Sequence, residues 1–244
     1  VLCAHTAKLV KMPKKIPYFD GMSQKLKRFL SPHYRPLLIL IFVGEIIFFL
    51  PFVLARVFRP TVLKVFELTN YELGSCFSAY GVVAMISYVF GGYLADRFQA
   101  KHLMAIGLWT TSAGGFYAVS IPSYEGMLFL YGYWGFTTIF LFWASMIRAT
   151  REWGGNNRQG KAFGLLEGGR GLVAAVVGVI AVTFFAWSAK GAGAYAPIRN
   201  RESFQIILVL TSVLVFSAGL IAYYGLPNSK KAVRKRLHFV KPSE

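Results

Sequence analysis

Gly92-Tyr93-Leu94-Ala95-Asp96-Arg97-Phe98-Gln99-Ala100-Lys101 is the stretch that decides the fold, because it places three charged residues between two long apolar segments. The segments run over about 74–95 and 103–121, so we expect a short loop joining two membrane helices. The glycine at position 92 would let the helix ends approach closely. The aspartate and the two bases would then form a charge network at the membrane face.

Apolar runs of this length recur along the chain and define its class. The chain has 244 residues, of which 55% are hydrophobic and 15% charged, whereas a soluble domain carries about 25% charged residues. A helix of about twenty apolar residues crosses a bilayer, and lipid favours helices because every backbone polar group must be satisfied internally. We therefore expect an all-α membrane protein with six transmembrane helices, at about 36–62, 74–95, 103–121, 127–148, 163–187 and 204–226.

The placement of positive charge predicts the topology. The net charge is +17, and most of the 27 lysines and arginines fall in the N-terminal arm, in the loops after the second and fourth spans, and in the tail. Because bases collect on the cytoplasmic side of membrane proteins, we expect both termini to be cytoplasmic. The expected partner is the lipid bilayer and not nucleic acid, since no nucleic-acid-binding motif accompanies the charge.

Three parts follow from these boundaries. Residues 1–34 form a basic cytoplasmic N-terminal arm, residues 35–226 form the six-helix bundle, and residues 227–244 form a basic tail or the start of a central linker. Span 5 opens with Gly160, Gly164 and Gly168, whose four-residue spacing puts them on one helix face. This face predicts close packing between helices or, as the alternative, a substrate contact through exposed backbone.

Four charged residues inside the spans are candidates for function, because a charge in the membrane interior faces a cavity or a partner. Glu45 and Arg56 in span 1 are eleven residues apart, so on one continuous helix they would share a face about 16 Å apart. Glu167 and Arg170 in span 5 are three residues apart and could pair. Arg56 would bind an anion or extend to the interface, and Arg170 would bind an anion or serve a structural pair. Glu45 would be a proton-coupling carboxylate, a neutral group, or the partner of an unidentified base in a missing second half of the protein.

The chemistry of arginine favours an anionic solute. Its planar guanidinium donates two parallel hydrogen bonds to a carboxylate or a phosphate. Two arginines on different helices that face one cavity would make an anion site, so a small anionic solute is the expected ligand.

The stretch 92–101 resembles the loop between the second and third helices of major facilitator superfamily transporters, whose pattern is roughly Gly-x-Leu-Ala-Asp-Arg-x-Gly-Arg-Lys. The similarity lies in Gly92, Leu94, Ala95, Asp96, Arg97 and Lys101, and the chain departs from the pattern at Gln99 and Ala100. The resemblance implies that Gly92, Asp96, Arg97 and Lys101 form a loop that stabilises one conformational state.

The resemblance extends to one branch of that superfamily, the organophosphate:anion antiporters or sugar-phosphate permeases. The run from Glu72-Leu73-Gly74 to Asp96-Arg97 is similar to that branch without a gap, as is Arg148 followed by Gly160. The resemblance implies substrate contacts at three positions. Arg56 matches an arginine of the first span that contacts substrate phosphate, Arg170 falls at a histidine of span 5, and Tyr88 falls at a lysine of span 2.

The same resemblance implies half of a twelve-helix transporter. Six helices would form two three-helix repeats of inverted topology, in an N-terminal half that is truncated or naturally split. Its partner would be the missing C-terminal six-helix half or a second copy, in a bacterial inner membrane, both termini cytoplasmic. We expect a secondary active transporter that moves an organic or phosphorylated anion by alternating access.

Other functions remain open or are disfavoured. A nitrate-type or other small-solute facilitator is an alternative, because Gly168-Gly169-Arg170-Gly171 is similar to the glycine-rich fifth span of those proteins. A non-transporting membrane sensor or regulatory subunit is another. We expect no metal, because the four histidines lack metal-binding spacing, and no enzyme, because no nucleophile–base pair is identifiable. We also expect no cofactor. The run 155–162 fails as a phosphate-binding loop, since Ala162 stands where Ser or Thr would hold magnesium.

Overall fold

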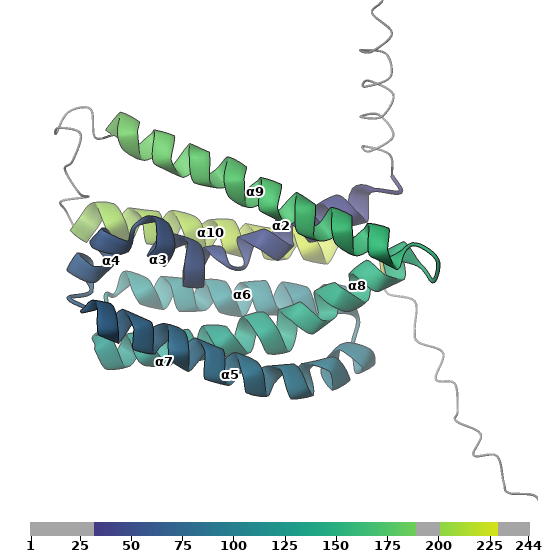
Figure 1. Cartoon of the computed structure of the whole chain (residues 1–244), viewed down its shortest axis with the longest axis horizontal. Helices are drawn as coiled ribbons and strands as arrows, with labels where there is room; N and C mark the ends of the chain where they lie inside the picture. The colour runs from purple at the N-terminus through teal and green to yellow at the C-terminus, as the bar shows by residue number, and fades with distance from the viewer. Residues whose placement is uncertain (1–31, 189–200, 229–244) are drawn as a thin grey trace, which may run out of the picture. The chain divides into compact units, whose positions relative to one another are not determined.

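The computed structural model describes residues 32–188 and 201–228, and this part of the chain is helical apart from short connections (Figure 1). The chain divides into two units, Val1–Arg35 and Pro36–Glu244, and the second unit holds almost all described residues. The prediction of an all-α fold is thereby confirmed for this part, while most of the predicted arm and tail lies outside it. The helices are α2 (Arg35–Ile46), η1 (Phe49–Val53), α3 (Leu54–Val57), α4 (Arg59–Val65), α5 (Asn70–Arg97), α6 (Ala100–Val119), α7 (Tyr124–Phe136), η2 (Thr137–Trp143), α8 (Ala144–Gly154), α9 (Gln159–Ser188) and α10 (Arg201–Gly225).

Five stretches of helix in the described residues are long and apolar enough to cross a membrane. The third expected span corresponds to α6, which is not among the five. The reason lies in its composition, because α6 begins with Lys101 and His102 and has Thr110-Thr111-Ser112 at its middle. The total of six spans therefore stays a prediction. The five stretches are Arg35–Val57, Asn70–Arg97, Tyr124–Gly154, Gln159–Ile180 and Phe204–Gly225.

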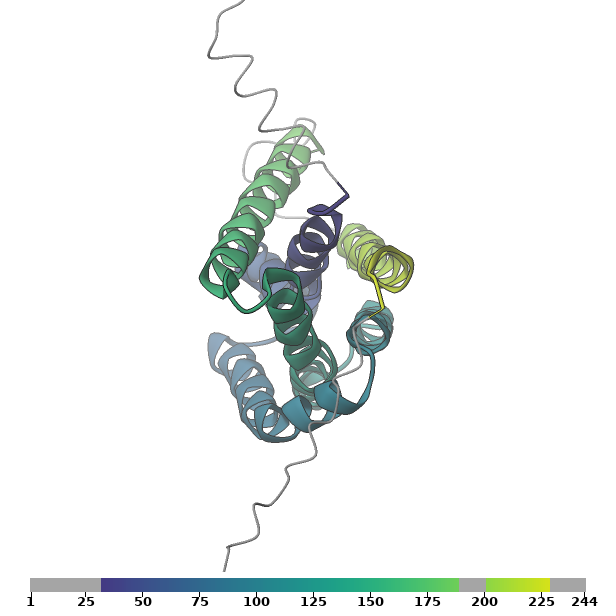
Figure 2. The ribbon, with the colours of Figure 1, turned by 90° about the vertical axis from the view of Figure 1, so that its right-hand side faces the viewer.

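α6 lies against α10 in both views (Figures 1 and 2), and small residues allow this contact. A β-carbon on Gly115 would collide with the hydroxyl of Ser212, and one on Gly219 would collide with the indole of Trp109. The Ser112 hydroxyl donates a 2.8 Å hydrogen bond to the Ser212 carbonyl. Close backbone approach of this kind is how helices associate in lipid, so α6 and α10 form a tight pair.

α5 packs on α7 and η2 through a second set of close contacts. A β-carbon on Gly135 would lie 2.6 Å from the carbonyl oxygen of Tyr80, so only glycine fits there. The Tyr80 hydroxyl lies 2.7 Å from the hydroxyl of Thr138, and both side chains are buried. The polar groups between these helices are thus satisfied within the bundle, as an apolar surrounding requires.

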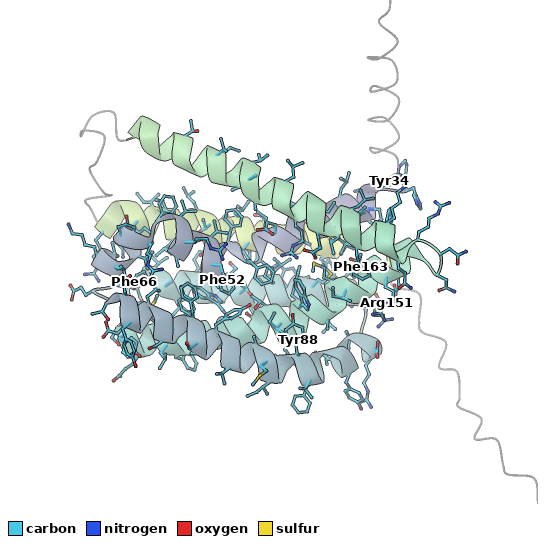
Figure 3. The ribbon with its side chains drawn as sticks, viewed as in Figure 1. Tyr34, Phe52, Phe66, Tyr88, Arg151 and Phe163 are labelled. Carbon is cyan, nitrogen blue, oxygen red and sulfur yellow. The ribbon has the colours of Figure 1, made fainter. Side chains whose placement is uncertain are left out.

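The first span is broken in its middle, which corrects the single helix expected over 36–62. Pro51 lacks an N–H and its ring would clash with the carbonyl four residues earlier, and here the backbone widens into the π-helical turns of η1. Phe52 lies at this break, and its ring centre is 4.7 Å from that of Tyr80 (Figure 3). Since Glu45 and Arg56 lie on either side of the break, the expectation that they share one helix face no longer holds.

The stretch that opened the sequence analysis is more helical than expected. α5 begins at a capping box, in which the Thr69 hydroxyl accepts from the Glu72 amide and the Glu72 carboxylate accepts from the Thr69 amide at 2.7 Å. It then continues through Arg97, so only Phe98 and Gln99 separate it from α6. The predicted loop of ten residues is therefore wrong in length, because a single continuous helix accommodates its first six residues.

Candidate functional site

The candidate site is a cluster of three charged side chains on two helices. Arg170 of α9 lies with its Nε 3.4 Å from a carboxylate oxygen of Glu45 on α2. Its Nη1 donates to both oxygens of Glu167, one helical turn away, at 3.1 and 3.0 Å. Arg170 and Glu45 are 13% and 14% exposed, whereas Glu167 is 55% exposed. The expectation that the base beside Glu45 lies in a missing half is therefore wrong, because Arg170 of the same chain pairs with Glu45.

Two aromatic rings contact the guanidinium. The Arg170 Cζ lies 5.5 Å from the ring centre of Phe48 and 5.2 Å from that of Trp143, distances at which a cation is attracted to the face of a ring. Phe48 directly precedes η1, and Trp143 is the last residue of η2. π-helical turns are frequent at functional sites, and here two such turns present the rings that contact one arginine.

Small residues bring α2 and α9 close enough for this cluster to form. A β-carbon on Gly44 would lie 2.7 Å from the sulfur of Met146 and 3.3 Å from Cδ of Arg170. One on Gly169 would lie 2.6 Å from Cδ1 of Ile41. Gly44 therefore leaves room for the stem of Arg170 to pass α2.

The glycines predicted to pack are not the ones that do. An added β-carbon on Gly160, Gly164 or Gly168 would meet no atom within 4 Å among the described residues, and the same holds for Gly92. The packing predicted for span 5, and the close approach predicted at position 92, are wrong within this part of the chain. The three glycines of α9 share one helix face, and that face is bare among the described residues.

The other predicted substrate residues lie elsewhere. Arg56 is exposed at the end of α3, and no ion pair reaches it from the part of the chain that the structure describes. Tyr88 lies on α5 and is 55% exposed (Figure 3). Neither residue contacts Arg170 in the described ranges. Phe48 was not predicted as a neighbour of Arg170, because it lies in the turn between α2 and η1 and the break of the first span is not visible in the sequence.

Electrostatics limit what the cluster can bind. One guanidinium faces two carboxylates, so with all three groups ionised the cluster carries a charge of −1. Removing the charge of one carboxylate, by protonation or by displacement, leaves hydrogen-bond donors of Arg170 for another anion. The cluster can therefore exchange an internal counter-ion for an external carboxylate or phosphate.

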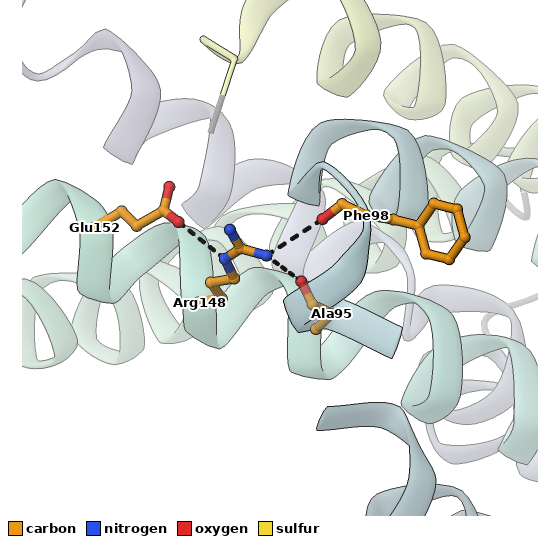
Figure 4. A network of polar contacts seen from close by, with 4 residues as sticks. All are labelled: Ala95, Phe98, Arg148 and Glu152. Atoms are coloured by element: carbon orange, nitrogen blue, oxygen red, sulfur yellow. Dashed lines mark hydrogen bonds and ion pairs between the residues drawn. The ribbon is translucent and has the colours of Figure 1, made fainter. Parts of the chain in front are cut away.

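The polar network at the end of α5 is centred on Arg148 of α8 (Figure 4). Its Nη1 donates to the carbonyl oxygens of Ala95 and Phe98, and its Nε bonds the carboxylate of Glu152 at 2.8 Å. Helix ends leave carbonyls without intrahelical partners, and Arg148 supplies donors for two carbonyls at the end of α5.

The charged residues of the predicted loop network make other contacts than the ones expected. Asp96 is exposed and forms no ion pair within residues 32–188 and 201–228. The Arg97 guanidinium lies 4.1 Å from the ring centre of Tyr93, and Lys101 lies 5.6 Å from that of Tyr223. Consecutive residues on a helix diverge by about 100°, so Asp96 and Arg97 cannot face one another once both belong to α5.

Replacing Arg148 by glutamine is expected to loosen the junction of α5 and α6. Hydrogen bonds to charged groups contribute about 1.5–3 kcal/mol each. Arg148 makes three such bonds, and glutamine has no positive charge to form them. We expect a lower melting temperature in detergent and faster amide exchange at residues 95–100. Arg151→Gln, which changes an exposed arginine on the same helix (Figure 3), is the matched control. Equal exchange in both variants would contradict the capping role of Arg148.

Comparisons with known proteins also indicate a membrane protein. Residues 38–241 match the sequence profile of the Major Facilitator Superfamily. The chain is 28% identical over 167 residues to the inner membrane protein YihN of Escherichia coli (strain K12), covering 68% of this chain and 38% of YihN. It is 27% identical over 189 residues to the inner membrane protein YqcE of the same organism, covering 77% of this chain and 42% of YqcE. The chain thus spans about two-fifths of the length of these relatives.

Proposed function

The chain belongs to the major facilitator superfamily of membrane transporters, and from this premise we propose that it moves a small organic or phosphorylated anion across an inner membrane by alternating access. Both relatives described above carry the name of inner membrane proteins, which supports that location. The resemblance of 72–97 and Arg148 to the organophosphate:anion antiporters supports this substrate class.

The observation that carries the proposal is the position of Arg170. Arg170 is the cation of the cluster, and 87% of its side-chain surface is buried. The carboxylates of Glu45 and Glu167 balance its charge, and we propose that they can separate from it. A substrate carboxylate or phosphate would replace Glu167, which is the more exposed partner, and take its hydrogen bonds from Nη1. The rings of Phe48 and Trp143 would hold the guanidinium in place during the exchange.

Glu45 supports a coupling step in the same site. We propose that a proton taken up by Glu45 removes its attraction for Arg170 and so strengthens binding of the external anion. Loss of the proton on the other side of the membrane would restore the ion pair and release the anion. Proton uptake and anion binding would then favour one another, which is the linkage that a proton-coupled transporter needs.

We also propose that a second six-helix body completes the transporter. Only 6% of the most apolar 18-residue stretch of α9 is buried. The glycines at positions 160, 164 and 168 of this helix form a bare face suited to close helix contact. α5 and α9 stand apart in both views (Figures 1 and 2). The greater length of the relatives also supports a further half, which would be joined to this chain or be a second copy.

Flux in liposomes tests the function. The full polypeptide that carries this sequence is reconstituted, and uptake of labelled glycerol phosphate, a small carboxylate and nitrate is compared with uptake of uncharged glycerol. We expect saturable uptake of an organic or phosphorylated anion and none of glycerol. Uptake of nitrate alone would favour the nitrate-type alternative. Anion binding without flux would instead support a membrane sensor and overturn the transport proposal.

A further inference from the structure

The outer side of α5 carries a groove that is separate from the charged cluster. Its volume is about 410 Å³, and it runs between α5 and the helix formed by α7 and η2. For comparison, an apolar cavity of about 150 Å³ takes up benzene, so the groove has room for a longer hydrocarbon. Side chains that line it include Val83, Ile86, Phe90 and Leu94 of α5, with Phe136 and Phe140 opposite.

One face of α5 forms the groove wall and ends in a cation. Positions 83, 86, 90, 94 and 97 follow one another at three or four residues, which places Arg97 in line with the wall. Arg97 is exposed, its guanidinium stacks on Tyr93 of the same groove, and it forms no ion pair with a carboxylate in the described part of the chain. The charge of Arg97 is therefore available to a ligand at one end of an otherwise apolar groove.

The dimensions match one leaflet of a bilayer. From position 83 to position 94 the helix rises by about 16 Å, close to half of the hydrocarbon core, which is about 30 Å thick. Arg97 lies about 4–5 Å further along the same axis, where the chain leaves the apolar segment. A phospholipid has the same order of parts, with a hydrocarbon chain that ends in a phosphate.

We propose that this groove binds one anionic phospholipid, with an acyl chain between α5 and η2 and its phosphate on Arg97. The stacked pair of Phe136 and Phe140, with ring centres 4.8 Å apart, forms the wall facing α5. The Tyr93 ring fixes the guanidinium of Arg97 at the groove end, and the planar fork then donates to phosphate oxygens. The site is independent of the transported anion, because none of these residues belongs to the cluster around Arg170.

Lipid titration followed by native mass spectrometry tests the proposal on the full polypeptide. The probes are phosphatidylglycerol and diacylglycerol with the same acyl chains. We expect the wild-type protein to retain one phosphatidylglycerol at least tenfold more tightly than diacylglycerol. Arg97→Gln should lower phosphatidylglycerol affinity at least tenfold, to the level of diacylglycerol, while Arg97→Lys should keep part of the preference.

Filling the groove separates this site from general lipid coating. Ile86→Trp should abolish retention of both lipids, because the indole occupies the space of the acyl chain, and Ile86 is 53% exposed, so the change is tolerated by the fold. Met85→Trp, at a 66% exposed position outside the groove, is the control and should bind both lipids as wild type does. Three outcomes would overturn the proposal: no lipid retained by the wild type, retention unchanged in Ile86→Trp, or an unchanged lipid preference in Arg97→Gln.

Discussion

Arg170→Ala is expected to reduce anion uptake at least about 30-fold. Arg170 supplies the charge-assisted hydrogen bonds that would hold the anion, and losing about 2 kcal/mol of such binding corresponds to about 30-fold, because 1.4 kcal/mol is a factor of ten. The variant also loses the only cation of the cluster, so Glu45 and Glu167 would repel an incoming anion. Initial uptake rates in liposomes, corrected for the amount of inserted protein, measure the effect.

Two further variants separate binding from folding in this experiment. Glu167→Gln removes the 55% exposed carboxylate, and we expect uptake to change by less than about threefold, since exposed ion pairs contribute only about 0–1 kcal/mol. The double variant Glu45→Gln with Arg170→Ala leaves no buried unpaired charge at this contact, so its thermal stability should recover while its uptake should not. Recovery of uptake in the double variant would show that Arg170 has a structural role only.

Glu45→Gln is expected to abolish uphill accumulation of the anion driven by a pH gradient. Glutamine resembles the protonated carboxyl, so Arg170 stays available at every pH and anion binding is no longer linked to proton uptake. One proton per anion supplies about 1.4 kcal/mol per pH unit, which is a tenfold accumulation in liposomes held at zero membrane potential. We expect the wild type to approach that ratio and the variant to stay near equal concentrations inside and outside.

Exchange of labelled for unlabelled anion by the Glu45→Gln variant is the control for this experiment. Exchange of labelled for unlabelled anion needs no proton, so Glu45→Gln should retain at least half of the wild-type exchange rate. Accumulation that still follows the pH gradient in this variant would contradict a coupling role for Glu45. Loss of exchange together with accumulation would instead point to a structural role.

The sequence predicts the helices better than their interior geometry. Runs of apolar residues locate α5, α9 and α10, and the residues 92–101 identify the superfamily, which the profile match confirms. α6 is less apolar, and it is not among the five helical stretches of the described residues that are long and apolar enough to cross a membrane. Pro51 is visible in the sequence, but its consequence is not, because a proline can bend, widen or end a helix.

The candidate site depends on contacts that local patterns do not encode. The pairing of Glu167 with Arg170 follows from their spacing, whereas that of Glu45 with Arg170 requires knowing which helices are neighbours. Likewise, the spacing of Gly160, Gly164 and Gly168 identifies a face but not what covers it. Gly44 and Gly169 make the close contacts beside the charged cluster, and no periodicity distinguishes them from the others.

The two-residue connection between α5 and α6 restricts how the protein can move. Phe98 and Gln99 are both extended, and two extended residues span only about 7 Å, so they allow little slack. α6 is in turn held to α10 by contacts that leave no room for a β-carbon. We therefore expect α5, α6 and α10 to move together as one unit, while the widened turns of η1 and η2 are the breaks in the helices beside them.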